Sequence, residues 1–127
     1  MIKVEQLMKK DLACVQAGTT ATAAAAMMEQ RAIGSVFVEQ RGKIVGIVTE
    51  SDIVRKVVGV NLLPERILVE EIMSAPIIGI ENNRPIIEAA DLMESNQTRH
   101  LAVTKSGAII GVLSVRDLLH PVSIDEF

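Results

Sequence analysis

The sequence predicts an α/β fold built from two copies of one strand-helix-strand-strand-helix unit. The first observation behind this is an internal repeat without gaps. A shift of 65 positions places VEQLM at 4–8 on VEEIM at 69–73, and GIVTESD at 46–52 on GVLSVRD at 111–117. The second is that both copies change from short apolar runs to helical spacing and back to β-rich runs. Self-similarity at a fixed offset indicates a repeated structural unit.

The first strand and helix of each copy follow from apolar spacing. Short apolar segments at 12–15 and 77–80 are expected to be strands. Each is followed by turn-forming residues and then by a helix with one apolar face. The apolar positions of these helices are 21, 24, 25 and 28 in the first copy and 86, 89, 90 and 93 in the second. Pro85 suits the first turn of the second helix, where a missing N–H costs nothing.

Two β-rich runs joined by a glycine-containing turn come after each helix. They are SVFVE and KIVGIVT around Gly42, and HLAVT and AIIGVLS around Gly107. This pattern predicts hairpins. A second helix is expected to begin near Glu50 and near Val115. In the first copy its apolar side is expected to consist of Ile53, Val54, Val57 and Val58.

The repeat also predicts the domain organisation. The first repeat is assigned to residues 1–60, a linker containing Asn61 and Pro64 to 61–68, and the second repeat to 69–127. A unit of this size buries little surface alone, so the two copies are expected to act as one module.

Composition disfavours nucleic acid as a ligand. The formal net charge is −3 at pH 7, and acidic and basic residues are scattered, so there is no basic stripe to attract a phosphate backbone. The sequence has no Trp or Tyr, and its two aromatic residues are Phe37 and Phe127. Single-stranded bases would therefore find almost no stacking platform.

The composition also favours a reducing compartment. Cys14 is the single cysteine, so no internal disulfide can form, and we expect it to be a small buried apolar residue. No apolar run reaches the roughly 18 residues that a membrane helix needs. We therefore expect a cytoplasmic protein without a membrane segment.

Signatures of catalysis and of metal binding are missing from the sequence. It contains no G-x-x-x-x-G-K-[ST], G-x-G-x-x-G or G-x-S-x-G string. His100 and His120 stand without a cysteine or histidine cluster around them. We expect a protein that is not an enzyme and that needs no cofactor or metal.

The most informative residues are Thr49 with Asp52 and Ser114 with Asp117, each pair at a junction between strand and helix. One interpretation is helix capping, in which the hydroxyl accepts a backbone N–H while the aspartate lies in the first turn. The other is a ribose site, in which an ionised aspartate accepts from two sugar hydroxyls and the hydroxyl side chain adds a partner. The two roles are compatible.

The repeated V-x-x-h-M opening, where h is apolar, the apolar-faced helix and the closing G-h-h-T/S-x-x-D string together resemble CBS (cystathionine-β-synthase) domains. The resemblance extends from residue 4 to about residue 121. The chain is similar to stand-alone bacterial and archaeal proteins that consist of a CBS pair. It implies two repeats packed as a pseudo-two-fold pair with two clefts between them, and dimerisation of such pairs. It also implies a regulatory ligand, AMP, ADP, ATP or S-adenosylmethionine, and signalling to a separate effector protein.

The resemblance also implies the site residues. Thr49 and Asp52 would hold ribose in one cleft, and Ser114 and Asp117 would hold it in the other. The adenine pocket of the family draws on the segment after the opening methionine and on the start of the second strand. The corresponding residues here are Leu12, Ala13, Ile33, Ser35 and Val36 for one cleft, and Ile77, Ile78, His100 and Leu101 for the other.

The two copies differ where a phosphate would lie. The second has Arg99 and His100 before its hairpin, which resemble the basic pair that meets phosphate in the sensor subunit of AMP-activated kinase, whereas the first has Gly34 and Ser35. We expect the Ser114 and Asp117 cleft to favour the phosphorylated ligand. Two alternatives stay open: Arg99 and His100 as a solvated pair at a strand edge, and the whole chain as a structural homodimerisation module with empty clefts.

Overall fold

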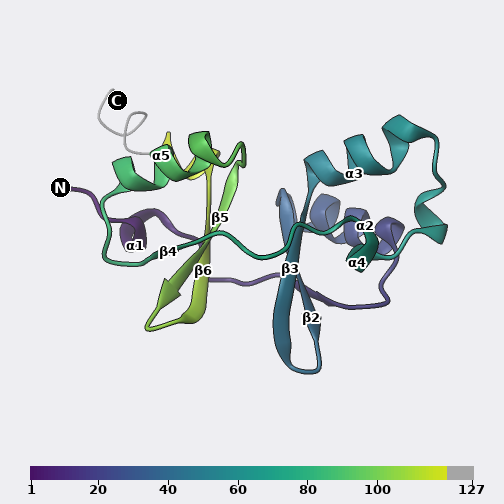
Figure 1. Cartoon of the computed structure of the whole chain (residues 1–127), viewed down its shortest axis with the longest axis horizontal. Helices are drawn as coiled ribbons and strands as arrows, with labels where there is room; N and C mark the ends of the chain where they lie inside the picture. The colour runs from purple at the N-terminus through teal and green to yellow at the C-terminus, as the bar shows by residue number, and fades with distance from the viewer. Residues whose placement is uncertain (120–127) are drawn as a thin grey trace. The chain divides into compact units, whose positions relative to one another are not determined.

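The computed structural model describes residues 1–119 and contains two compact units (Figure 1). The first, here called the central unit, consists of Ala13–Ile77. The second, the composite unit, joins Met1–Leu12 to the described residues from Ile78 to 119. The part of the predicted second repeat at 120–127 lies outside the described residues.

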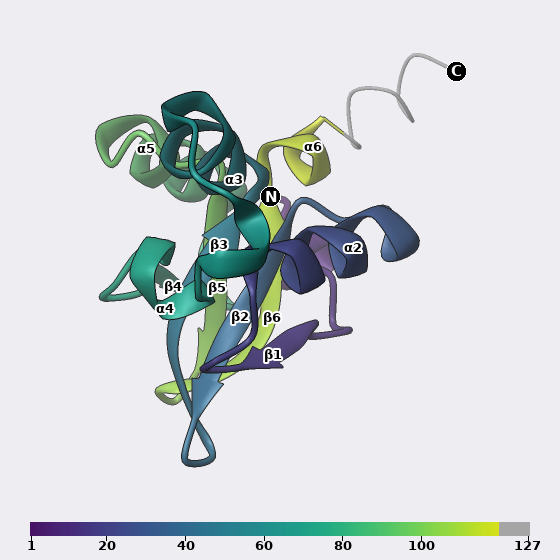
Figure 2. The same ribbon diagram turned by 90° about the vertical axis from the view of Figure 1, so that its right-hand side faces the viewer.

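The central unit is a three-stranded sheet with helices packed on one face. Its elements are β1 (Cys14–Gln16), α2 (Ala21–Arg31), β2 (Ser35–Gln40), β3 (Lys43–Thr49), α3 (Glu50–Lys56), the 3-10 helices η1 (Val58–Val60) and η2 (Pro64–Arg66), and α4 (Val69–Ile72). The strand order is β1-β2-β3, with β1 parallel and β3 antiparallel to β2. Figure 2 looks onto the face that carries α2, α3 and α4. Apolar side chains of the strands and of these helices form one buried cluster.

The composite unit repeats this arrangement. Its elements are α1 (Val4–Leu7), β4 (Gly79–Glu81), α5 (Ile86–Ser95), β5 (His100–Lys105), β6 (Ala108–Ser114) and α6 (Val115–Leu118). The strand order is β4-β5-β6, again parallel and then antiparallel. Val4 of α1 and Met93 of α5 are buried in its core with strand residues such as Leu101. The predicted α/β class, the two hairpins and both second helices are confirmed.

The compact units do not follow the bounds of the sequence repeats, because the opening segment of each repeat packs with the other repeat's sheet. Lys9, after α1, pairs with Val112 of β6, and Ser74, after α4, pairs with Ile47 of β3. Val4 is wholly buried in the composite core, as Val69 is in the central core. The first copy's opening helix therefore completes the second copy's core, and the reverse holds for α4.

The first strands begin later than predicted. β1 starts at Cys14 and β4 at Gly79, each two residues after the start of the expected segments at 12–15 and 77–80. The chain leaves one unit and enters the other between Leu12 and Ala13 and between Ile77 and Ile78. Leu12 and Ile77 therefore lie outside the unit to which the strand after them belongs.

One other expectation about local structure needs correction, and several short helices are present that we did not predict from the sequence. Pro85 is the residue before the helix, with extended ψ of 149°, and α5 begins at Ile86. The predicted linker contains η2 and the segment before it contains η1. The opening segments, for which we predicted no structure, form the short helices α1 and α4.

The apolar side of α3 is narrower than predicted. Val57 is wholly buried and Ile53 packs against the core, but Val54 is 60% exposed and Val58 57% exposed. The helix ends at Lys56, and Val57 leaves it with φ of −123° and ψ of −74°. Helical spacing therefore stops before Val58 and cannot bring it to the face of Ile53.

Cys14 is half-buried rather than buried. It lies on β1, an edge strand of its sheet, opposite Phe37 of β2. Partial burial raises the pKa of its thiol, the negative charge of Glu39 raises it further, and the positive charge of Arg31 lowers it. The thiol is therefore held in its neutral form more firmly than an exposed thiol.

Candidate functional site

Thr49 and Asp52 form a reciprocal hydrogen-bonded pair at the start of α3. The backbone N–H and the hydroxyl of Thr49 donate to Asp52 Oδ2, at 2.9 and 3.2 Å. The backbone N–H of Asp52 donates to Thr49 Oγ1 at 3.2 Å. Asp52 is only 7% exposed. This is a capping box, so the capping interpretation of the sequence is confirmed at this helix.

Ser114 and Asp117 repeat the same geometry at the start of α6. The backbone N–H and hydroxyl of Ser114 donate to Asp117 Oδ2 at 2.8 and 3.0 Å, and the Asp117 N–H donates to Ser114 Oγ at 3.3 Å. Asp117 is 8% exposed. In both units one carboxylate oxygen, Oδ2, is therefore committed to the helix start.

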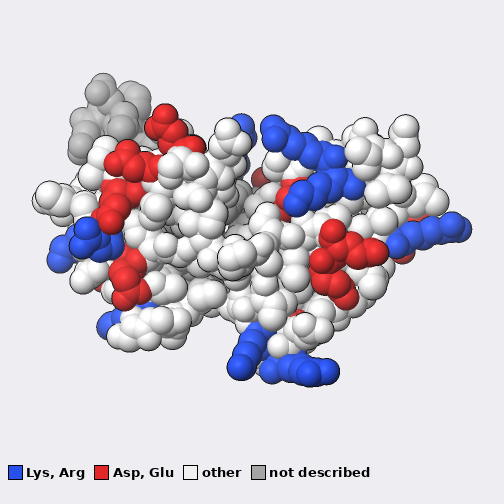
Figure 3. Space-filling view, in the orientation of Figure 1, with Lys and Arg blue, Asp and Glu red and all other residues white. Residues whose placement is uncertain are grey.

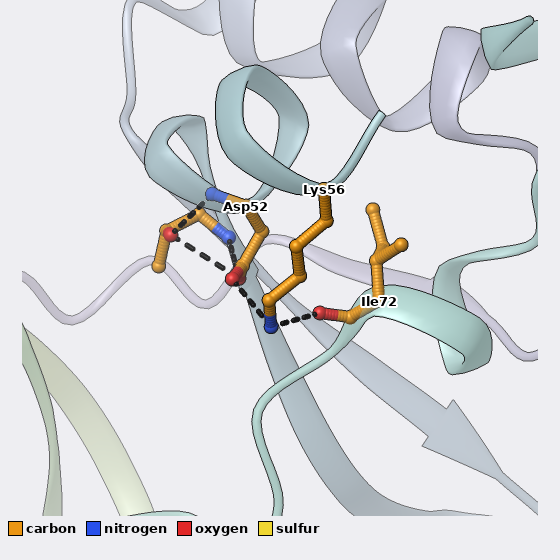
Figure 4. Close-up of polar contacts among 4 residues, drawn as sticks. Asp52, Lys56 and Ile72 are labelled. Carbon is orange, nitrogen blue, oxygen red and sulfur yellow. Dashed lines mark hydrogen bonds and ion pairs between the residues drawn. The ribbon is translucent and has the colours of Figure 1, made fainter. Parts of the chain in front are cut away.

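The other oxygen of each carboxylate faces a lysine. Lys56 Nζ lies 2.9 Å from Asp52 Oδ1 and donates to the carbonyl oxygen of Ile72 at 2.8 Å, so it bridges α3 and the end of α4 (Figure 4). In the composite unit, Lys9 Nζ lies 3.5 Å from Asp117 Oδ1. The two lysines are not equivalent in the repeat, yet they meet equivalent aspartates.

We did not predict either lysine. Lys56 could have been found, because it stands four residues after Asp52 and such pairs meet on one side of a helix. Lys9 could not, because it comes from the opposite end of the chain and reaches Asp117 only through the packing of the opening segment on β6.

The opening methionines pack on the glycines that precede the capping pairs. A Cβ added at Gly46 would lie 2.8 Å from Cγ of Met73, and one added at Gly111 would lie 2.8 Å from Sδ of Met8. The two methionines are 65 positions apart, and so are the two glycines. The repeat could therefore have predicted a contact between the V-x-x-h-M opening and the closing string. Each methionine therefore lies against the strand that ends at Thr49 or Ser114.

The hairpin starts lie beside the capping pairs. Ser35 is the register partner of Thr49, and His100 is the register partner of Ser114. The N–H of Val115 also donates to the carbonyl of Arg99 at 2.9 Å. Arg99 is exposed and His100 is half-buried. The structure therefore brings the basic pair to the strand end that carries Ser114 and the start of α6.

The residues expected to contact adenine divide between the two units. Ala13 accepts a hydrogen bond from the Phe37 N–H at 2.8 Å, and Ile78 accepts one from the Ala102 N–H at 3.0 Å, so both lie beside the second strand of their unit. The central unit holds Ala13, Ile33, Ser35 and Val36, and the composite unit holds Ile78, His100 and Leu101. Leu12 belongs to the composite unit and Ile77 to the central unit, so neither is in the same unit as the residues with which it was grouped.

Burial limits what some of these side chains can contact. Val36 is 1% exposed and Leu101 wholly buried, each within the apolar cluster of its own unit. Ser35 is also buried, at 9% exposure. A ligand at these positions would therefore meet backbone atoms of Val36 and Leu101 rather than their side chains.

Charges of both signs lie on the surface of the protein. On the face shown in Figure 3, Lys and Arg residues are interspersed with Asp and Glu residues on both units.

Within residues 1–119 no helix is long and apolar enough to cross a membrane. In the same part of the chain, no three His, Cys, Asp or Glu side chains gather in a way that could hold a metal ion.

Comparison with known proteins identifies the repeated unit. The family model of the CBS domain matches residues 4–59 and 69–123. The chain belongs to the CBS domain family. Its fold is similar to that of a CBS-domain protein of Burkholderia ambifaria assigned to signal transduction, at 32% identity and a TM-score of 0.93 over 99% of this chain and 97% of that one. The resemblance stated from the sequence is thus confirmed.

Two further relatives extend the comparison. A hexameric CBS-CP12 protein from bloom-forming cyanobacteria has a TM-score of 0.89 at 26% identity, over 99% of this chain and 74% of that one. An uncharacterised protein of Methanopyrus kandleri is 32% identical over 93% of this chain. The chain spans 61% of the length of the Methanopyrus protein.

Proposed function

We propose that this CBS pair is a non-catalytic sensor that binds an adenosine-containing ligand at its Thr49–Asp52 and Ser114–Asp117 sites and signals to a separate effector protein. The observation that carries the proposal is the recurrence of one buried carboxylate beside a hydroxyl in the same geometry in both units. A structural cap needs an aspartate or asparagine oxygen to accept from the helix start, which Oδ2 does. It does not require acceptor capacity on the second oxygen, Oδ1.

The carboxylates keep acceptor capacity beyond capping. An ionised carboxylate offers about four lone-pair directions. Oδ2 of each aspartate accepts two hydrogen bonds, and Oδ1 faces one lysine. Hydroxyl donors of a ribose would therefore be received at Oδ1, where each charge-assisted bond contributes about 1.5–3 kcal/mol. Candidate ligands are AMP, ADP, ATP and S-adenosylmethionine.

The two sites are proposed to differ in affinity. Arg99 and His100 stand at the hairpin start beside Ser114, whereas Gly34 and Ser35 occupy the equivalent place beside Thr49. An arginine and a histidine that can become charged attract phosphate oxygens. The Ser114–Asp117 site is therefore proposed to bind the phosphorylated ligand more tightly, which titration calorimetry showing two equal tight sites would contradict.

A screen of melting temperatures tests the proposal. The wild-type chain is heated with AMP, ADP, ATP, S-adenosylmethionine and NADH, then compared with Asp52→Asn and Asp117→Asn, because Asn keeps an oxygen for the cap and removes the charge. Ligand at 100 times its Kd should add about 2.7 kcal/mol to the free energy of unfolding for each site that it binds. Exposed Asp91→Asn on α5 is the matched control.

Each variant is compared with its own ligand-free melting temperature, so a loss of intrinsic stability does not imitate a loss of binding. We expect the variant that carries both Asp52→Asn and Asp117→Asn to lose the increase in melting temperature with ligand. The Asp91→Asn variant should retain this increase. No shift with any of the five compounds in the wild-type chain would reject the ligand-sensing function.

The second candidate is a structural homodimerisation module, alone or combined with sensing. Large apolar side chains are exposed along one segment of the central unit, namely Val54, Val58, Val60, Leu62 and Leu63. The related cyanobacterial protein is hexameric. Light scattering with Val54→Glu and Val58→Glu tests this candidate, which expects a dimer in the wild-type chain and a monomer in the double variant.

A further inference from the structure

The lysines beside the two aspartates suggest how the sites distinguish between ligands. In each unit, Oδ2 is already used by the helix start, so a ribose that donates both hydroxyls needs both acceptor directions of Oδ1. Lys56 Nζ takes one of these directions at Asp52, and Lys9 Nζ faces the same oxygen at Asp117. A diol and the lysine therefore compete for one oxygen.

Both ammonium groups can leave the carboxylate without leaving the site. The side chains of Lys56 and Lys9 are 46% and 60% exposed, so their ends have room to turn. Their attachment points are fixed, since Lys56 lies in α3 and Lys9 is held by backbone hydrogen bonds with Val112 at 2.9 and 3.0 Å. A displaced ammonium therefore stays close to the bound ligand.

We propose that Lys56 and Lys9 are specificity-determining residues that make each site select adenosine ligands with a net negative charge over neutral or cationic ones. This rests on the function proposed above. A neutral adenosine breaks an ion pair and leaves the ammonium without its carboxylate partner. A phosphate on the ligand supplies a new anionic partner, so the exchange costs little. The sulfonium of S-adenosylmethionine would instead meet a displaced cation.

The arrangement occurs twice through unrelated residues. Position 56 corresponds in the repeat to Pro121, and position 9 corresponds to Ser74, so neither lysine is copied in the other unit. Yet each places a positive charge on the Oδ1 oxygen of the equivalent aspartate. The sequence repeat therefore does not explain why a lysine faces Oδ1 of both aspartates. Such a recurrence is expected if each site requires a cation.

Calorimetric titration with AMP and with adenosine tests the proposal one site at a time. An Asp117→Asn background isolates the Asp52 site, and Lys56→Met then removes the charge while keeping the length of the side chain. The ratio of AMP affinity to adenosine affinity should fall about tenfold, the loss of one charge-assisted hydrogen bond. The reciprocal pair, Lys9→Met in an Asp52→Asn background, should behave alike. S-adenosylmethionine should bind more tightly to both methionine variants than to their parents.

Three controls separate this inference from the proposed function. Lys56→Arg keeps the charge and should retain the ratio, and Arg55→Met and Lys10→Met remove neighbouring charges and should leave it within about twofold. Binding of AMP and adenosine that depends on Asp52 but shows the same ratio in Lys56→Met overturns the role of the lysine alone. Absence of binding by every adenosine compound in the wild-type chain overturns the role of the lysines together with the sensing function.

Discussion

Met73 packs so closely on Gly46 that a Cβ on the glycine would lie 2.8 Å from Met73 Cγ. The equivalent contact, Met8 on Gly111, has a further constraint, since the same added Cβ would lie 2.8 Å from the carbonyl oxygen of Lys9. That carbonyl accepts from the Val112 N–H and is therefore fixed. The glycine of each closing string is thus required by close approach rather than by an unusual φ.

The difference between these contacts predicts unequal costs of substitution. Gly111→Ala should lower the free energy of unfolding by about 1–3 kcal/mol, because its new methyl group meets backbone that cannot move away. Gly46→Ala should cost less, because a flexible methionine side chain can turn aside. Urea denaturation of the two variants measures both losses. A larger loss for Gly46→Ala would contradict this account of the contact.

The capping boxes predict a local cost at each helix start. Thr49→Ala and Ser114→Ala should each destabilise the protein by about 0.5–2 kcal/mol, because the N–H of the aspartate loses its acceptor. Thr49→Ser is the matched control and should retain most of the stability. Thermal denaturation checks both variants, and an alanine variant as stable as the serine one would show that the pair does not act as a cap.

Both hairpin turns should accept a stabilising substitution. Arg41 and Ser106 have φ of 53° and 52°, in the left-handed region, and each precedes a glycine with positive φ. Asn adopts this region more readily than Arg or Ser, and Asn-Gly is the preferred sequence of such turns. Arg41→Asn and Ser106→Asn should each raise the free energy of unfolding by up to about 1 kcal/mol. A β-branched control, Arg41→Val, should lower it.

The raised pKa of Cys14 predicts slow alkylation. Burial is the main cause of the increase, with Glu39 as the second, so at pH 8 the thiolate fraction is smaller than in an exposed thiol. Iodoacetamide should react slowly at pH 8 and faster as the pH rises above 9. Glu39→Gln removes one cause of the increase and should speed the reaction at pH 8. An alkylation rate equal to that of a free cysteine peptide would contradict this environment.

The same pKa has a consequence for stability. Because the folded state holds the thiol proton more firmly than the unfolded state, the associated stability is present below the unfolded pKa. It is lost as the pH rises through the folded pKa. Cys14→Ala should therefore reduce the decrease in stability between pH 8 and pH 10, as followed by urea denaturation at each pH.

Local pattern was enough to predict much of this protein. The sequence determined the α/β class, the hairpins around Gly42 and Gly107, and the capping pairs that begin with Thr49 and Ser114, because each depends on residues close together in the chain. The repeat at a fixed offset added the equivalence of the two sites. None of these features requires knowledge of how distant segments meet.

Tertiary structure decided what distant segments do. Only packing placed α1 on the sheet of the second repeat, because Val4 is buried by a core formed more than seventy residues later in the chain. Only packing brought Lys9 to Asp117. Periodicity tells which residues share a face, whereas the partner of that face is chosen by complementary shape and burial across the whole chain.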